Sequence, residues 1–153
     1  MPVSGCSFCE NAGDLSRVGA VIYEDERCAL LLHEDWAVRG HAMLVWRRHV
    51  ENVADLSEDE ARHFAEIHRR AENALLAVTG AQRAILVKLG IQTPHLHLHI
   101  YPVRASLDRA AVMAVIDGRV REPEDDLLIH ELRKELRKRL RKQLRKRLTP
   151  PAQ

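Results

Sequence analysis

The stretch HLHLHIY at residues 95–101 alternates histidine with aliphatic residues. In an extended strand, successive side chains point to opposite faces of the sheet. The three histidines and Tyr101 therefore share one face, and the three aliphatic residues share the other. Thr93-Pro94 precedes the stretch, so the chain enters it extended. Such a row can bind a metal, present a nucleophilic imidazole between orienting groups, or form a polar face toward solvent.

Apolar runs elsewhere in the chain predict four more strands. Residues 18–23 and 27–32 flank the acidic turn at 24–26 and are typical of a β-hairpin. Further strands are expected at 41–47 and 83–89. With the histidine stretch they predict an antiparallel sheet of about five strands, preceded by an irregular N-terminal segment.

One long helix is expected between these strands. Ser57 and Glu60 form a capping box, in which the serine side chain accepts from a first-turn amide and the glutamate reaches back to the cap amide. Apolar residues then recur at helical spacing as far as Gly80, which ends the helix. A shorter helix is expected over 106–116. Strands, one long helix and more strands predict an α+β fold.

The composition is that of one globular domain. The chain has 153 residues, 46% of them hydrophobic and 30% charged, which excludes wholesale disorder. No apolar run approaches the ~18 residues of a membrane span. The N-terminus has neither a basic n-region nor an apolar h-region, so we expect no cleaved secretory signal and a cytoplasmic location.

The net charge of +2 hides a basic tail. Residues 131–148 hold ten Lys/Arg and two Glu, a charge of +8, so the rest of the chain, with 14 basic and 20 acidic residues, carries −6. Leucine recurs there every four residues, at Leu132, Leu136, Leu140, Leu144 and Leu148. We therefore divide the chain into a domain over 1–122 and a basic amphipathic helical tail over 123–153. Such a helix can bind RNA, an anionic membrane or a partner helix, or pack within a dimer with its cationic face in solvent.

The histidine stretch resembles the histidine triad (HIT) motif, in which three histidines alternate with hydrophobic residues. Residues 6–9 (CSFC) are similar to the N-terminal Cys-x-φ-Cys of many members, and residues 21–25 to their first hairpin. Residues 40–45 resemble the family's Gly-His strand, and 48–50 the Lys/Arg-His-φ that follows it. The resemblance covers roughly residues 6–104 and leaves the tail out.

The resemblance implies a HIT-like sheet and transfer or hydrolysis at the α-phosphate of a nucleotide, through a nucleotidyl-histidine intermediate. Imidazole is a nucleophile at neutral pH because its pKa of ~6.5 leaves much of it neutral. We expect His97 to be the nucleophile, with Nδ1–H held by a backbone carbonyl and Nε2 left to attack. By family match, His99 and His41 contact the phosphate or the leaving group; the alternative for His41 is a strand-start residue without a role. Neither a catalytic metal nor an organic cofactor is implied.

Residues around the triad are expected to bind substrate. Gln92 and Thr93 lie where relatives have Gln-Ser or Gln-Thr and are candidate phosphate donors. Two positions depart from the family's pattern: His33 replaces an aspartate that holds the ribose, and Lys88 replaces an asparagine. Lys88 suits an extra phosphate or acidic group, or is a solvent-facing charge. Glu34, next to His33, is expected to point elsewhere on a strand.

Cys6 and Cys9 supply two thiols, which in a chain without an export signal favour metal or redox chemistry over a disulfide. Family members with this pair complete a zinc site with two histidines, which correspond to His49 and His95. Structural zinc takes four ligands in a closed tetrahedron. The alternative is a reduced pair without metal. Cys28 lies in an apolar strand and is expected to be a buried small hydrophobe.

Two functions follow as hypotheses. The first is a homodimeric nucleotide hydrolase or transferase that acts on a dinucleoside polyphosphate, a nucleoside phosphoramidate or a similar compound, with structural zinc. The second is a non-catalytic nucleotide- or zinc-binding module whose basic tail recruits RNA, a membrane or a protein partner. We favour the first because the histidine row is complete.

Overall fold

A five-stranded antiparallel sheet forms the centre of the molecule, in the order β1-β2-β3-β5-β4. The computed structural model describes residues 3–34, 36–123 and 125–148, with side chains as far as residue 139. The strands are β1 (Gly19–Glu24), β2 (Cys28–His33), β3 (Ala42–Trp46), β4 (Arg83–Val87) and β5 (His97–Val103). The helices are α1 (Ser7–Glu10), α2 (Glu58–Thr79), α3 (Arg109–Ile116) and α4 (Asp126–Leu148), with 3-10 turns η1 (Leu15–Arg17) and η2 (Val53–Asp55). The predicted α+β fold is confirmed.

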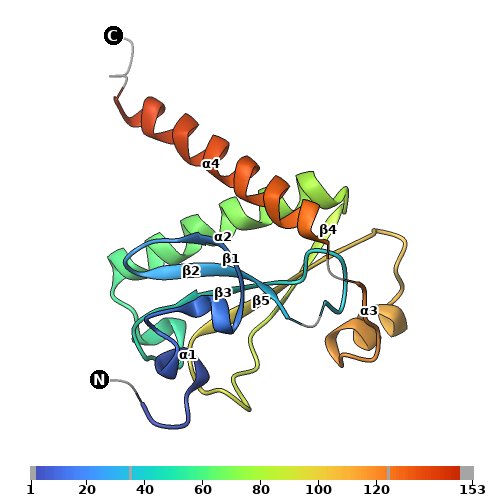
Figure 1. The fold of residues 1–153 in the computed structure, drawn as a ribbon, viewed down its shortest axis with the longest axis horizontal. Helices are drawn as coiled ribbons and strands as arrows, with labels where there is room; N and C mark the ends of the chain where they lie inside the picture. Colours follow the sequence, from blue (N-terminus) through green and yellow to red (C-terminus); the bar gives the residue numbers. More distant parts are fainter. Residues whose placement is uncertain (1–2, 35, 124, 149–153) are drawn as a thin grey trace.

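Helices α2 and α4 lie along one face of this sheet, and the N-terminal segment with α1 lies on the other (Figure 1). The helix-covered face holds the larger core. Its buried side chains include Leu30, Leu44, Trp46 and Ile100 from the strands and Leu96 just before β5. The opposite face holds a smaller core, in which strand residues such as Leu31, Met43 and Val45 meet Phe8 and Leu15 of the N-terminal segment.

Helix α2 begins and ends where its sequence predicts. The Ser57 side chain accepts from the Glu60 amide at 3.3 Å, and the Glu60 carboxylate accepts from the Ser57 amide at 2.8 Å. Gly80 follows with a φ of 72°, a left-handed conformation that glycine adopts without a steric penalty. Phe64, Ile67 and Leu75 are buried from this helix against the sheet.

The first half of α4 is built into the same core. Leu128, Leu132 and Leu136 are buried among side chains of α2 and the sheet, whereas Leu127 is 74% exposed. Arg133 also donates from Nε to the Val21 carbonyl of β1, at 2.9 Å. The boundary between residues 122 and 123 stays a prediction, and these contacts extend the packed core beyond it. The side chains of Leu140, Leu144 and Leu148 lie outside the described part.

Two local expectations were wrong. The N-terminal segment is not wholly irregular, because residues 7–10 form a single helical turn and the Asp14 side chain caps η1 by accepting from the Ser16 amide. Turns of this length are too short to show helical periodicity. Strand β5 begins at His97 rather than His95, because the His95 amide turns back to the Thr93 carbonyl at 2.8 Å. Among the described helices, none is long and apolar enough to cross a membrane.

Candidate functional site

His97 stands at the start of β5 with one ring nitrogen fixed by the backbone. Its Nδ1 donates to the carbonyl oxygen of His95 at 2.7 Å, as predicted. The ring packs against Phe8, with centroids 5.1 Å apart, and the residue is 8% exposed. Nε2 has no hydrogen-bond partner within the described part of the chain. The lone pair of this nitrogen is therefore available to an electrophile.

Burial keeps the imidazoles of this row neutral. It lowers the pKa of His97, and the positive charge of Lys88 acts in the same direction, against the hydrogen bond to the His95 carbonyl. Burial also lowers the pKa of His99 to about 4, with further contributions from His97 and His33. Both rings are thus uncharged near neutral pH, which is the form a nucleophilic imidazole requires.

His41 lies just before β3 and is 3% exposed. Its Nε2 is 3.0 Å from Nδ1 of His99, so one ring donates to the other. The ring of His41 stacks on that of His33, with centroids 4.5 Å apart, and on that of Tyr101, with centroids 4.2 Å apart. His41 therefore reaches the row through His99, and the ring stack holds both in place.

A cavity of about 470 Å³ opens over His97 and His99. It is also lined by His33, Glu34, Gln92 and Thr93, and by Ser7 and Phe8 from the N-terminal side. Gln92 and Thr93 thus line the same cavity as His97 and His99. A smaller cavity of about 250 Å³, next to α3, adjoins His33, His41, His99 and Tyr101.

Glu34 departs from what the sequence predicted, whereas Lys88 has the solvent-facing placement that the sequence left open. Glu34 lines the larger cavity together with His33, because β2 ends at His33 and strand alternation no longer fixes the direction of the next side chain. Lys88 is exposed, is not part of the lining of this cavity, and donates from Nζ to Asn52 Oδ1 at 3.1 Å. Ser7 and Phe8 were not predicted as site residues, although they lie between the two cysteines of the motif at residues 6–9.

Four candidate metal ligands come together beside this row. The ligand atoms of Cys6, Cys9, His49 and His95 all lie within 4.8 Å of one another. Nδ1 of His95 is 3.3 Å from Cys6 Sγ and 3.6 Å from Cys9 Sγ, and Nδ1 of His49 is 3.3 Å from Cys9 Sγ. Tetrahedral zinc with bonds of ~2.3 Å to sulfur and ~2.0 Å to nitrogen separates such atoms by about 3.5 Å. The spacing therefore fits a Cys2His2 zinc site.

The orientation of His95 also suits a metal ligand. Its Nε2 donates to the Trp46 carbonyl, so Nδ1 carries the lone pair that faces the two sulfurs. A ligand histidine is commonly oriented by such a bond from its other nitrogen. Burial raises the pKa of the Cys6 thiol and lowers the pKa of His95, so both groups favour their neutral forms. A neutral imidazole can bind a metal directly, and a bound cation would supply the positive charge that stabilises the thiolate of Cys6.

The model of the HIT domain family matches residues 17–106, more than half of the chain. The chain belongs to the HIT domain family. The protein named Protein hit from Bacillus subtilis (strain 168) is 26% identical over an alignment of 110 residues, which covers 63% of this chain and 70% of that relative.

Solved structures of HIT proteins have the same fold. A Zn-bound histidine triad family protein from Mycobacterium smegmatis is similar with a TM-score of 0.67 and 21% identity, over 87% of this chain and 94% of its own. A hypothetical histidine triad nucleotide-binding protein from Sulfolobus tokodaii is similar with a TM-score of 0.62 and 22% identity, over 87% of this chain and 90% of its own. The predicted HIT-like sheet is confirmed by these likenesses.

Proposed function

We propose that this HIT protein is a nucleotide hydrolase or transferase that cleaves its substrate at a phosphate, through a covalent nucleotidyl-histidine on His97. Family membership supports a nucleotide-binding or hydrolase-type role. The observation that carries the finer proposal is the ring of His97, which is fixed through Nδ1 and borders a cavity of about 470 Å³. The substrate class is a dinucleoside polyphosphate, a nucleoside phosphoramidate or a similar compound.

The reaction takes place in two displacements. Nε2 of His97 attacks the α-phosphorus with its lone pair, and the bond from phosphorus to the leaving group breaks, so the leaving group departs with that electron pair. Water, or another acceptor hydroxyl, then attacks the same phosphorus and loses a proton to solvent, which replaces the proton that the leaving group took up. The N–P bond breaks and its electron pair returns to Nε2, which restores the neutral ring. A covalent intermediate of this kind divides one difficult step into two easier ones.

His99 and His41 assist at the phosphate. If His41 donates from Nε2 to Nδ1 of His99, the tautomer of His99 carries its own N–H on Nε2 and can donate toward the cavity. Gln92 and Thr93, in the same lining, add donors for the phosphate oxygens. His33 and Glu34, which line the same cavity, bind the nucleoside part of the substrate. The Lys88 side chain is exposed and can give up its hydrogen bond to Asn52 Oδ1 for one to a substrate phosphate.

The test compares His97→Ala with the intact chain on a fluorogenic nucleoside phosphoramidate and on diadenosine polyphosphates. We expect turnover in the intact chain and none in the variant. Equal turnover in both would exclude His97 as the nucleophile. Nucleotide binding without turnover in either would favour the second hypothesis, a non-catalytic binding module.

Zinc at Cys6, Cys9, His49 and His95 is part of the proposal, as a structural ion and not a participant in the reaction. It is supported by the donor spacing and by a relative whose solved structure is Zn-bound. Elemental analysis of protein purified without chelators should find zinc, and Cys9→Ser should lose it. A wild-type protein that holds no zinc would remove this part of the proposal.

A homodimer is also proposed. Strand β4 is an edge of the sheet. Leu86 on this strand is 43% exposed, and Leu89 and Ile91, just after it, are 62% and 81% exposed. An exposed apolar edge strand offers unpaired backbone groups to a second copy. Light scattering should give twice the mass of the chain for the wild type and less for Leu86→Lys.

The basic tail is a second binding candidate, for RNA or an anionic membrane. Helix α4 extends beyond the sheet (Figure 1), and Arg137 and Lys138 on it are exposed. Because Leu132 and Leu136 belong to the core, the test removes residues 140–153 only. Binding of RNA or of anionic vesicles should fall with added salt and with this truncation; unchanged binding would remove the idea. The cytoplasmic location stays a prediction.

A further inference from the structure

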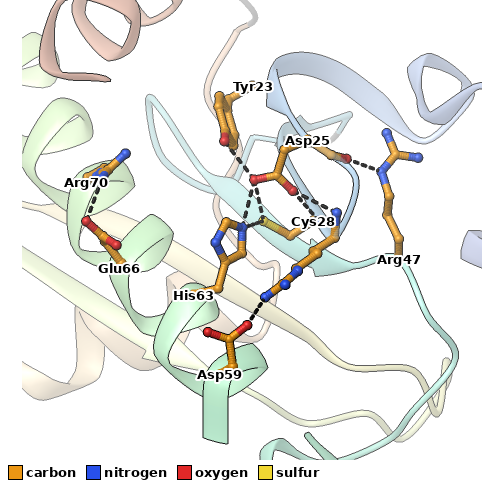
Figure 2. Close-up of polar contacts among 9 residues, drawn as sticks. Tyr23, Asp25, Cys28, Arg47, Asp59, His63, Glu66 and Arg70 are labelled. Atoms are coloured by element: carbon orange, nitrogen blue, oxygen red, sulfur yellow. Dashed lines mark hydrogen bonds and ion pairs between the residues drawn. The ribbon is translucent and has the colours of Figure 1, made fainter. Parts of the chain in front are cut away.

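A second group of metal-binding side chains lies on the helix-covered side of the sheet. Asp25 lies in the turn between β1 and β2, Cys28 is the first residue of β2, and His63 lies on the second turn of α2. Figure 2 shows the three side chains pointing toward one another between the turn and the helix. The sequence analysis expected Cys28 to be only a buried hydrophobe and gave His63 no site role.

The three ligand atoms converge on one point. Asp25 Oδ2 is 2.8 Å from His63 Nε2, and Cys28 Sγ is 3.9 Å from each of these two atoms. A tetrahedral zinc ion separates oxygen, nitrogen and sulfur ligands by about 3.4–3.6 Å. A change of about half an ångström in each separation would therefore seat the ion.

This arrangement does not suit a catalytic relay. In a Cys–His–carboxylate relay, the nucleophile and the carboxylate bond to different nitrogens of the imidazole. Here Asp25 and Cys28 both face Nε2 of His63. Burial and the neighbouring carboxylate raise the pKa of the Cys28 thiol, which also disfavours a free thiolate nucleophile.

Neighbouring groups hold the Asp25 carboxylate in position. Its Oδ1 accepts from the backbone amides of Arg27 and Cys28 at 2.8 and 2.9 Å, and its Oδ2 accepts from the Tyr23 hydroxyl at 2.7 Å (Figure 2). Ligands oriented by surrounding hydrogen bonds are typical of protein metal sites. The turn thus presents Oδ2 to His63 before any ion binds.

An acidic cavity of about 450 Å³ connects this cluster to solvent. Its lining carries four carboxylates against two guanidiniums, from Asp25, Glu26, Asp59 and Glu66 and from Arg27 and Arg62. Because Arg70, outside the lining, pairs with Glu66, one negative charge remains in excess, and this charge favours a cation. Cys28 itself is buried, so an ion here would have protein ligands on one side and the cavity on the other.

We propose that Asp25, Cys28 and His63 form a second cation site, for a thiophilic divalent ion such as Zn²⁺, with the fourth coordination position open to this cavity. One sulfur, one imidazole and one carboxylate suit zinc or cobalt better than magnesium or calcium. On binding, the Cys28 thiol releases its proton to solvent and becomes a thiolate ligand, and the proton that His63 Nε2 shares with Asp25 moves to Nδ1, so that Nε2 offers its lone pair. The ion then ties the β1–β2 turn to α2. This site does not depend on the proposed nucleotide chemistry.

Metal stoichiometry tests the site in the full chain. After dialysis against Zn²⁺ and removal of free ion, the wild type should retain one ion more than Cys28→Ala and one more than His63→Gln, both of which keep the Cys6–Cys9 pair. His68→Gln is the matched control, because it makes the same change on the same helix at a histidine that pairs with Glu72 instead. It should retain as many ions as the wild type. Equal metal content in the wild type and both cluster variants overturns the proposal.

Cobalt provides a second measurement that does not rely on Cys28→Ala folding normally. His63 is partly exposed on the helix surface, so His63→Gln leaves the core intact. Titration with Co²⁺ should give thiolate-to-cobalt absorption, part of which is missing from His63→Gln and present in His68→Gln. Identical cobalt spectra for the wild type and His63→Gln overturn the proposal.

Discussion

The two faces of the sheet receive side chains from the same strands, but only one of them combines a smaller apolar core with a row of imidazoles. On the face toward α2 and α4, Leu44, Leu96 and Ile100 are completely buried. On the other face, His97 and His99 border an open cavity and are covered only in part by the N-terminal segment. The comparison teaches that close packing on one face fixes the register of β5, and this register places the imidazoles on the other face.

The largest effect is expected from the open face. His97→Ala should lower kcat/KM for a nucleoside phosphoramidate by about 10³-fold or more, because it removes the proposed nucleophile. The midpoint of thermal unfolding should fall less than for a leucine of the larger core, since the ring packs outside that core, against Phe8. Steady-state kinetics and a thermal melt on the same preparation measure the two quantities. A large loss of stability with little loss of turnover would break the contrast between the faces.

The covered face should respond in the opposite way. Leu132→Ala removes a completely buried side chain of α4 and should lower the free energy of unfolding by about 2–5 kcal/mol. Leu127→Ala, on the same helix but 74% exposed, is the control and should change it by less than about 0.5 kcal/mol. Urea denaturation measures both. Equal, small effects would show that α4 is a separate tail, as the boundary after residue 122 predicts.

Acid should destabilise the open face through His99. Its pKa in the fold is lowered from 6.5 to about 4 by burial, so the unfolded chain binds the proton more readily. The stabilising contribution is therefore complete above about pH 6.5 and is lost as the pH falls toward about 4, with a magnitude on the order of 3 kcal/mol. Unfolding free energies measured across this range should fall less steeply for His99→Gln than for the wild type. Parallel curves would contradict the assignment.

The smallest effect concerns the start of α2. Ser57→Ala removes the cap acceptor and should lower the free energy of unfolding by about 1 kcal/mol. Ser57→Asp keeps an acceptor at this position and should be close to the wild type. Because the cap is remote from the cavity, kcat/KM should be unchanged in both variants. A change in kcat/KM would contradict this expectation and show that the helix-covered face influences the cavity on the other face.

Much of this fold could be predicted from local patterns. The alternation in β5, the capping box of α2 and the apolar runs of the hairpin each lie within a few residues, so neighbouring side chains decide them. The end of β2 at His33 is a matter of hydrogen-bond pairing with other strands, and it is the reason that Glu34 lines the cavity against expectation. The four zinc-site residues were predicted from a family resemblance, because their spacing alone does not determine the set.

By itself, the sequence determined which residues share a face of a strand or helix, and hence that His97 and His99 stand on one face of β5. Only the tertiary structure decided which distant residues meet that row or each other. Cys6 contacts His95 across 89 positions, and Asp25 contacts His63 across 38. Local periodicity is encoded in adjacent side chains, whereas these contacts depend on the order of the strands and on which helix covers which face.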